Sequence, residues 1–254
     1  SGNSATSGGG IHVGSGTVNL KNSIVTGNTG GDISGTLIDQ GNNLVGIDAL
    51  LGPLADYGGP TQTLALLPGS PAVDAISDGS CSSTDQRGLP RVGNCDIGSF
   101  ESRGFTAGTL TGTPQATLVG TNFAEPLGMT VTANSPAEPV SGGKVTFTGP
   151  ASGAGISPAS VTGSIDGTGK VSANVTANGV QGAYTVVASG NGIGGSYAYS
   201  LANVVSPVAN AVSAAVAYGS VGNVITLNIT GGTPTSVAVV SAAAHGTATA
   251  SGTA

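Results

Sequence analysis

The chain has 254 residues, of which 38% are hydrophobic, 4% aromatic and 7% charged, and its formal net charge is −6. With only six lysine and arginine residues it has no basic patch that could neutralise phosphates, so we exclude a nucleic-acid partner. Its 45 glycines and its lack of tryptophan favour thin β-structures with many tight turns over one large enzyme core.

Residues 1–48 repeat themselves loosely. Gly-Gly-Gly-Ile at 8–11 returns as Gly-Gly-Asp-Ile at 30–33, and Asn-Ser-Ile-Val at 22–25 returns as Asn-Asn-Leu-Val at 42–45. Offsets of about 20 residues are typical of one turn of a parallel β-solenoid. We therefore predict the last rungs of a parallel β-helix here, with further rungs upstream. The positions expected to face inward are Ile11, Val13, Val18, Leu20, Ile24, Ile33 and Leu44.

Residues 49–104 are dense in turn-forming residues and hold both cysteines. Cys81 and Cys95 predict one structural disulfide, which would add about 3 kcal/mol of stability by restricting the unfolded chain. Half of a metal site is the alternative, but the histidines, His12 and His245, are far away in sequence. We predict a loop-rich cap that is stapled by the disulfide.

A cluster of charged residues surrounds the two cysteines. It could be a binding or metal site, or a set of ion pairs that fixes the loops of the cap. We favour ion pairs, because the planar fork of arginine is suited to holding loop carbonyls and carboxylates. The residues of this predicted cluster are Asp85, Arg87, Arg91, Asp96 and Glu101.

Several of these motifs together resemble a known family. GGGI at 8–11, GTVNLKNSIVTGNT at 16–29, LLGPLADYGGPTQTLALLPGSPAVDA at 50–75, TDQRGLPR at 84–91 and CDIGSFE at 95–101 are similar to the C-terminal end of bacterial right-handed β-helix surface proteins of the choice-of-anchor Q type. The resemblance covers about the first hundred residues. It implies a secreted or cell-surface bacterial protein, although here the chain continues into further strands where a sorting tail would be expected.

From about Phe105 the pattern changes to strands of strict period two, such as those at 127–133, 144–147 and 170–175. About seven short strands over a hundred residues are typical of an immunoglobulin-like sandwich. Asp166-Gly167 and Asn178-Gly179 predict hairpin turns. We predict an Ig-like β-sandwich over 105–205, similar to the bacterial Ig-like repeats of surface adhesins.

Residues 206–254 resemble the start of a second repeat of that kind. Alternating residues at 224–230 and 236–239 predict strands, and the stretch 245–253 resembles the central hairpin of the repeat. The strands that should follow are missing. We predict an incomplete Ig-like repeat, so the fold class as a whole is all-β.

Candidate catalytic carboxylates are sparse. A β-helix lyase or glycosidase would need carboxylates, or a carboxylate and a basic side chain, that converge on one groove. Asp32, Asp39 and Asp48 fall at corners and loop starts, where aspartate caps turns, so we predict structural roles for them. The Asp166-Gly-Thr-Gly stretch suggests calcium only weakly and is better explained as a turn. No cofactor or metal is predicted.

These features favour a non-enzymatic structural or adhesin-type protein, the stalk and spacer region of a bacterial cell-surface or secreted protein. Its partners would be carbohydrate or a host or cell-surface protein, and no segment is expected to insert into a membrane, because no long apolar run is present. The alternative is the C-terminal accessory part of an extracellular carbohydrate-active enzyme whose active site lies upstream. A third option is a sugar-binding module that uses Tyr57, Tyr197 or Tyr199 as stacking platforms.

Overall fold

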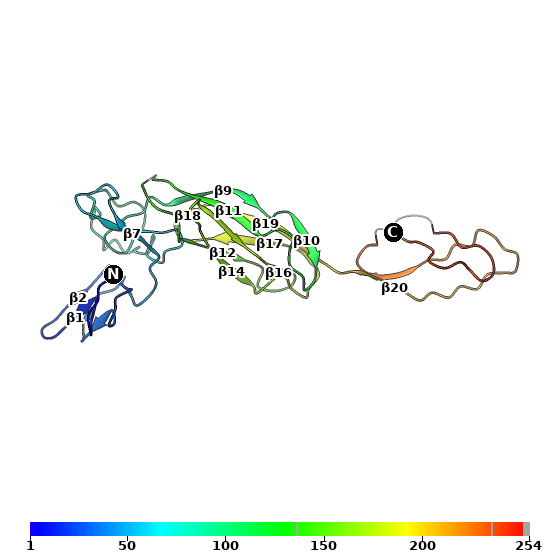
Figure 1. Ribbon diagram of the computed structural model, residues 1–254, viewed down its shortest axis with the longest axis horizontal. Helices are drawn as coiled ribbons and strands as arrows, with labels where there is room; N and C mark the ends of the chain where they lie inside the picture. The colour runs from blue at the N-terminus through cyan, green and yellow to red at the C-terminus, as the bar shows by residue number, and fades with distance from the viewer. Residues whose placement is uncertain (136, 235, 251–254) are drawn as a thin grey trace.

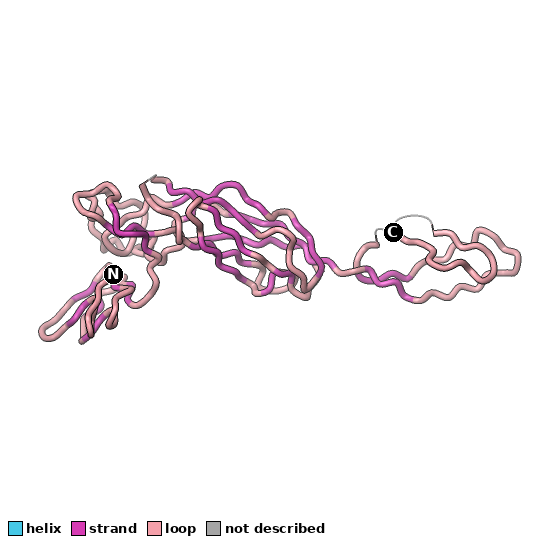
Figure 2. The backbone as a smooth tube through the Cα atoms, viewed as in Figure 1, coloured by secondary structure: helices cyan, strands magenta, loops and turns pink. Residues whose placement is uncertain are grey.

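The computed structural model describes residues 1–135, 137–234 and 236–250, and in these ranges the chain is all-β and has no helix (Figure 1). We name four consecutive parts the coil (1–48), the cap (49–104), the sandwich (105–205) and the tail (206–250). Strands gather in the sandwich, whereas the coil, the cap and the tail consist mainly of turns and loops (Figure 2).

The coil is two turns of chain that lie one on the other in parallel register. Ile11 pairs with Ile33 and Ile24 pairs with Leu44, which is the spacing of the repeated motifs. The strand pairs are β1 (Ile11–His12) with β4 (Ile33–Ser34), β2 (Asn19–Leu20) with β5 (Ile38–Asp39), and β3 (Ile24–Val25) with β6 (Leu44–Val45).

Repeated asparagines mark one corner of the coil. Asn22 and Asn42 both have positive φ, 50° and 54°, a conformation that asparagine tolerates better than most residues. The Asn42 amide donates a 3.1 Å hydrogen bond to the Asn22 side chain, and the Asn22 amide donates to the main-chain oxygen of Ser80 in the cap. The sequence repeat at 22 and 42 therefore builds both a turn and a contact with the cap.

Of the seven positions expected to face inward, only Leu20 is buried, and the other six are partly buried: Ile11, Val13, Val18, Ile24, Ile33 and Leu44. Leu20 is buried as predicted, but at the third strand pair the buried residue is Val25 and not Ile24. A Cβ on Gly10 would lie 2.7 Å from the Val25 Cγ1, so glycine is needed where the chain passes over this side chain. Ile24 and Leu44 instead lie partly buried against the apolar cluster of the cap.

The cap contains one antiparallel pair, β7 (Leu51–Ala55) with β8 (Thr63–Leu66), and two isolated bridges, Ile76 with Cys95 and Thr84 with Pro90. The rest of the cap is turns. Its small core is formed by Tyr57, Ala65, Leu66, Ala72, Val73, Ile76, Cys95, Ile97 and Phe100.

The sandwich consists of two sheets that enclose one core. The larger sheet has the order β10 (Gln115–Leu118), β19 (Tyr197–Val204), β17 (Gly182–Ser189), β12 (Lys144–Thr148), β14 (Ser160–Ser164). The smaller has the order β15 (Lys170–Ala173), β11 (Leu127–Ala133), β9 (Phe105–Thr111), β18 (Ile193–Gly194), and β13 (Ile156–Ser157) pairs with β16 (Thr176–Ala177). Both sheets are mixed, because β10 runs parallel to β19 and β18 runs parallel to β9.

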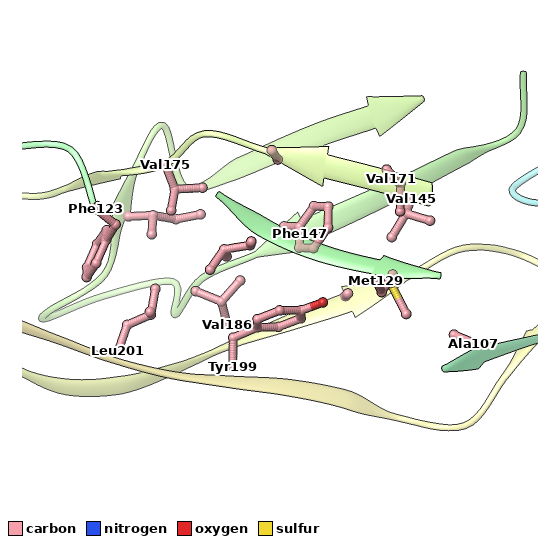
Figure 3. Packing of buried hydrophobic residues seen from close by; sticks show 14 of the residues in the cluster. Ala107, Phe123, Met129, Val145, Phe147, Val171, Val175, Val186, Tyr199 and Leu201 are labelled. Atoms are coloured by element: carbon pink, nitrogen blue, oxygen red, sulfur yellow. The ribbon is translucent and has the colours of Figure 1, made fainter. Parts of the chain in front are cut away.

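Period-two alternation places every second side chain of these strands in the core. Val145 and Phe147 of β12 are fully buried, while the residues between them are not. The Phe147 and Tyr199 rings meet edge to face at 5.6 Å (Figure 3), and the Tyr199 hydroxyl donates to the Gly128 carbonyl at 2.8 Å. The one hydroxyl at the centre of this core is therefore satisfied, as burial requires.

The two predicted hairpins are wrong. β14 and β15, on either side of Asp166-Gly167, belong to different sheets, and so do β16 and β17 on either side of Asn178-Gly179. The first turn carries the chain from the larger sheet to the smaller one, and the second carries it from the separate β13–β16 pair to the larger sheet. The positive φ of the first turn falls on Gly169, at 78°, while the Asp166 carboxylate accepts the N–H groups of Thr168 and Lys170.

The tail has one antiparallel pair, β20 (Pro207–Asn210) with β21 (Asn228–Gly231). The strand expected at 224–230 forms only from Asn228 onward, and 236–239 is not a strand. The hairpin expected at 245–253 shows no strand up to residue 250, and its remainder lies outside the described residues. Val221, Val224 and Val240 are more than nine-tenths exposed, so the tail buries little apolar surface.

Candidate functional site

The five charged residues predicted to cluster around the disulfide come together inside the cap. Cys81 and Cys95 form the predicted disulfide, with Cα atoms 6.5 Å apart. Cys95 is buried and exchanges two backbone hydrogen bonds with Ile76. The loop that the disulfide closes therefore starts and ends at fixed points, and it carries Asp85, Arg87 and Arg91.

A tight turn positions the first ion pair. Asp85 accepts the N–H groups of Arg87 and Leu89 through Oδ1, and its Oδ2 lies 2.7 Å from Nη2 of Arg87. The Arg87 guanidinium also lies 3.6 Å from the centre of the Phe100 ring, a cation–π contact. Burial alone would raise the pKa of Asp85, but hydrogen bonds from Arg87 and from the Glu101 N–H lower it below the ordinary value.

The second ion pair joins Arg91 and Glu101 at 2.7 Å, between Nη1 and Oε2. Arg91 also donates to the carbonyl oxygens of Asp96 and Gly98, and Glu101 accepts the Val92 N–H. Both side chains therefore hold main-chain groups of loops that have no sheet partner. This is the loop-holding role that the sequence predicts.

Asp96 differs from the other carboxylates of the cluster, because among the described residues no basic side chain bonds to its carboxylate oxygens. Its Oδ1 accepts the Asp74 N–H at 2.7 Å and its Oδ2 accepts the Ser102 N–H at 2.6 Å. Burial, aided by the neighbouring charges of Glu101 and Asp74, raises the pKa of Asp96 to about 7, even though the two N–H groups act to lower it. Asp96 is therefore the titratable group of the cap near neutral pH.

A sixth charged residue, Glu138, completes the cluster and comes from the sandwich. Its carboxylate accepts the Ser102 hydroxyl at 2.9 Å and the Arg103 N–H at 3.1 Å, and it lies 4.0 Å from Arg87. Burial raises the pKa of Glu138. The sequence analysis missed it, since Glu138 stands alone in a proline-containing loop with no charged neighbour in the chain.

The other candidate carboxylates cap turns. Asp32 accepts the Asn28 N–H, Asp39 accepts the Gly41 N–H, and Asp48 accepts the Leu50 N–H. In the part of the chain that the structure describes, no group of three or more His, Cys, Asp or Glu residues could hold a metal ion.

Two of the three tyrosines suggested as sugar platforms cannot serve. Tyr57 is 8% exposed and its ring packs edge to face on Phe100, while Tyr199 is fully buried in the sandwich. Tyr197 is partly buried, and its hydroxyl donates to the Gly194 carbonyl. The suggested role as a sugar-stacking platform is therefore wrong for Tyr57 and Tyr199, because such a platform must present the face of its ring to solvent.

A shallow cleft of about 430 Å³ lies between the coil and the cap. Its floor is apolar, with Ile24, Leu66, Ile97 and Phe100, and Asn22 lies at its rim. None of the described side chains that line it is ionisable. None of the charged side chains of the cluster is among the residues that line this cleft.

No family model, no curated protein and no solved structure matches this chain. Within residues 1–135, 137–234 and 236–250, no helix has the length and apolar character needed to cross a membrane.

Proposed function

We propose that this chain is a scaffold, the stalk and spacer region of a bacterial cell-surface or secreted protein, and not an enzyme. In this proposal residues 1–48 are terminal turns of a parallel β-helix, 49–104 a disulfide-stapled cap, 105–205 an Ig-like spacer and 206–254 an incomplete repeat. The parallel coil, the disulfide and the two-sheet core support this division.

One observation carries the proposal. Asp85, Arg87, Asp96, Glu101 and Glu138 are all buried, and each bonds to main-chain groups of the loops around it. A catalytic group must reach solvent or substrate, whereas these side chains hold loops that lack sheet partners. The buried charged side chains of this cluster therefore serve to hold the loops in place.

The extracellular setting rests on two supports. Disulfides persist in oxidising compartments, and a small cap of 49–104 with a thin core gains stability from one. The resemblance of 8–101 to bacterial surface proteins points the same way. Adhesion to carbohydrate or to a host or cell-surface protein would be the use of such a stalk.

Surface labelling tests the proposal directly. Antibodies raised against residues 49–205 should stain intact cells that express the whole gene, or detect the product in their medium, without permeabilisation. Staining only after permeabilisation would contradict it.

The whole gene product should also release no reducing ends or unsaturated sugars from a panel of plant and bacterial polysaccharides. Release that persists in purified protein would instead favour the accessory part of a carbohydrate-active enzyme.

A further inference from the structure

Glu138 lies in the loop between β11 and β12 of the sandwich, yet its carboxylate is enclosed by the cap. The side chain has no exposed surface. Its Oε2 accepts the Ser102 hydroxyl at 2.9 Å, and both oxygens lie 3.1 Å from the Arg103 nitrogen. Arg87 of the cap lies 4.0 Å from Oε1. One sandwich residue thus satisfies two donors of the cap and faces a third.

These contacts join Glu138 to the rest of the buried network. Ser102, which donates its hydroxyl to Glu138, donates its N–H to Asp96. Arg87, which faces Glu138, pairs with Asp85 inside the loop closed by the disulfide. The carboxylate is therefore two contacts away from both Asp85 and Asp96.

Main-chain hydrogen bonds form a second contact between the cap and the sandwich. The Lys144 N–H donates to the Pro68 carbonyl at 2.8 Å, and the Gly69 N–H donates to the Asn191 carbonyl at 2.9 Å. If the cap separated from the sandwich here, these peptide groups would be exposed to water, and water could replace the hydrogen bonds that they lose. Loss of Glu138 would leave the partly buried Arg103 N–H and the buried Ser102 hydroxyl without this acceptor, and an unsatisfied buried donor costs more than a lost bond.

We infer that Glu138 latches the cap to the sandwich, so that residues 49–205 open as one cooperative unit with one relative orientation. The inference goes beyond the proposed function, because it concerns the coupling of two parts and would hold equally for an accessory region of an enzyme. A spacer built in this way would hold the cap and the sandwich in one orientation, without a hinge at residue 104.

Native-state hydrogen exchange on the whole chain in increasing urea tests the latch. The Ile97 N–H, bonded to Ala72, reports on the cap, and the Val131 N–H, bonded to Gly169, reports on the sandwich. In the unmodified protein both amides should exchange through the same opening, with the same urea dependence. In Glu138→Ala the cap amide should exchange about tenfold faster or more, while the sandwich amide keeps its slower rate.

Glu125→Ala is the matched control, because Glu125 is an exposed glutamate of the same sandwich whose hydrogen bonds come from its main chain. In Glu125→Ala both amides should still exchange through the same opening, with the same urea dependence. Glu138→Gln keeps one acceptor and should separate the two rates in the same direction but by less, which decides the matter if the alanine variant does not fold. Two independent openings in the unmodified protein, or equal rates for both amides in the Glu138 variants, would overturn the inference.

Discussion

Asp96 shows how a single side chain can set the pH response of the cap. Its carboxylate is 1% exposed and bonds only to two backbone N–H groups among the described residues. Glu101, the acidic neighbour that raises the Asp96 pKa, is itself neutralised by Arg91. Asp96 is therefore protonated in the folded state over a pH range in which the unfolded chain ionises it, and burial raises the pKa of its neighbour Asp74 in the same direction.

The sign of the pH effect follows from the two pKa values. The Asp96 pKa is 3.8 in the unfolded chain and about 7 in the folded protein, so the folded state binds this proton more tightly. The stability of the cap should fall as pH rises from about 4 to about 7 and then level off, with about 1.4 kcal/mol at stake per pH unit. Glu138, whose pKa is also raised by burial, adds a fall of the same sign.

Thermal midpoints measured from pH 4.5 to 8 check this expectation. The unmodified protein should lose stability toward pH 7, and Asp96→Asn should have a flatter slope, whatever its overall stability. The comparison uses the difference in slope, because asparagine also removes an acceptor from the Asp74 or Ser102 N–H. Parallel slopes in the two proteins would mean that Asp96 is ionised throughout.

At the scale of an element, the disulfide is what gives the cap loop its fixed ends. Replacing both Cys81 and Cys95 by alanine should lower the free energy of unfolding of the cap by about 3 kcal/mol, because the unfolded loop regains its freedom. Urea unfolding monitored by exchange of cap amides measures the change. Reduction of the unmodified protein with dithiothreitol is the control and should give a similar loss. Equal midpoints with and without the disulfide would contradict this account.

Gly69 lies where the cap passes close to the sandwich. Its φ is +83°, and a Cβ there would lie 2.5 Å from the Lys144 carbonyl oxygen. Gly58, in the same cap, has a φ of +93° but nothing within 4 Å of the added Cβ. Both alanine substitutions therefore meet the same backbone penalty of about 1 kcal/mol, and only Gly69→Ala also forces the two parts of the chain apart.

Urea unfolding of the two alanine variants separates these effects. Gly69→Ala should be more destabilising than Gly58→Ala by about 1 to 3 kcal/mol, in the range of an overpacked contact. If both variants lose the same stability, the Gly69 contact with Lys144 is not a tight one in solution.

At the scale of the whole molecule, the tail differs from the other three parts in charge and in burial. Lys170 is the last basic residue and Asp166 the last acidic one, so the tail has no Asp, Glu, Lys or Arg at all. Among the described residues its strands β20 and β21 pair only with each other, and valines such as Val221 and Val240 are exposed. Few buried apolar contacts give a segment low local stability.

Limited proteolysis tests this difference. Thermolysin, which cleaves before apolar residues, should remove the tail within the time in which residues 49–205 stay intact, since the sandwich strands hold their apolar residues in a core. Trypsin is the control and should leave the tail attached to the sandwich, because it has no site after Lys170. Survival of the tail for as long as the sandwich would show that it is packed against another part of the molecule.

Prediction from sequence worked best where one short stretch of chain contains all the determinants. The cap charges and cysteines lie within 81–101, and their clustering predicted both the disulfide and the mutual bonding of the charges. The repeats at 22 and 42 predicted the parallel register of the coil. Prediction failed where one sequence pattern fits two arrangements. Asp166-Gly167 indicates a turn, but it does not indicate whether the strand after the turn joins the same sheet as the strand before it.

The sequence by itself determined the all-β character, because small and β-branched residues at period two, broken by glycine, cannot bury a helical face. It also determined the local bonding of the cap. Only the tertiary structure decided that Ile24 turns toward the cap, that the turns cross between sheets, and that Glu138 enters the cap from the sandwich. These contacts join segments far apart in the chain, and their partners are selected by packing and by the need to satisfy buried donors, which no local pattern records.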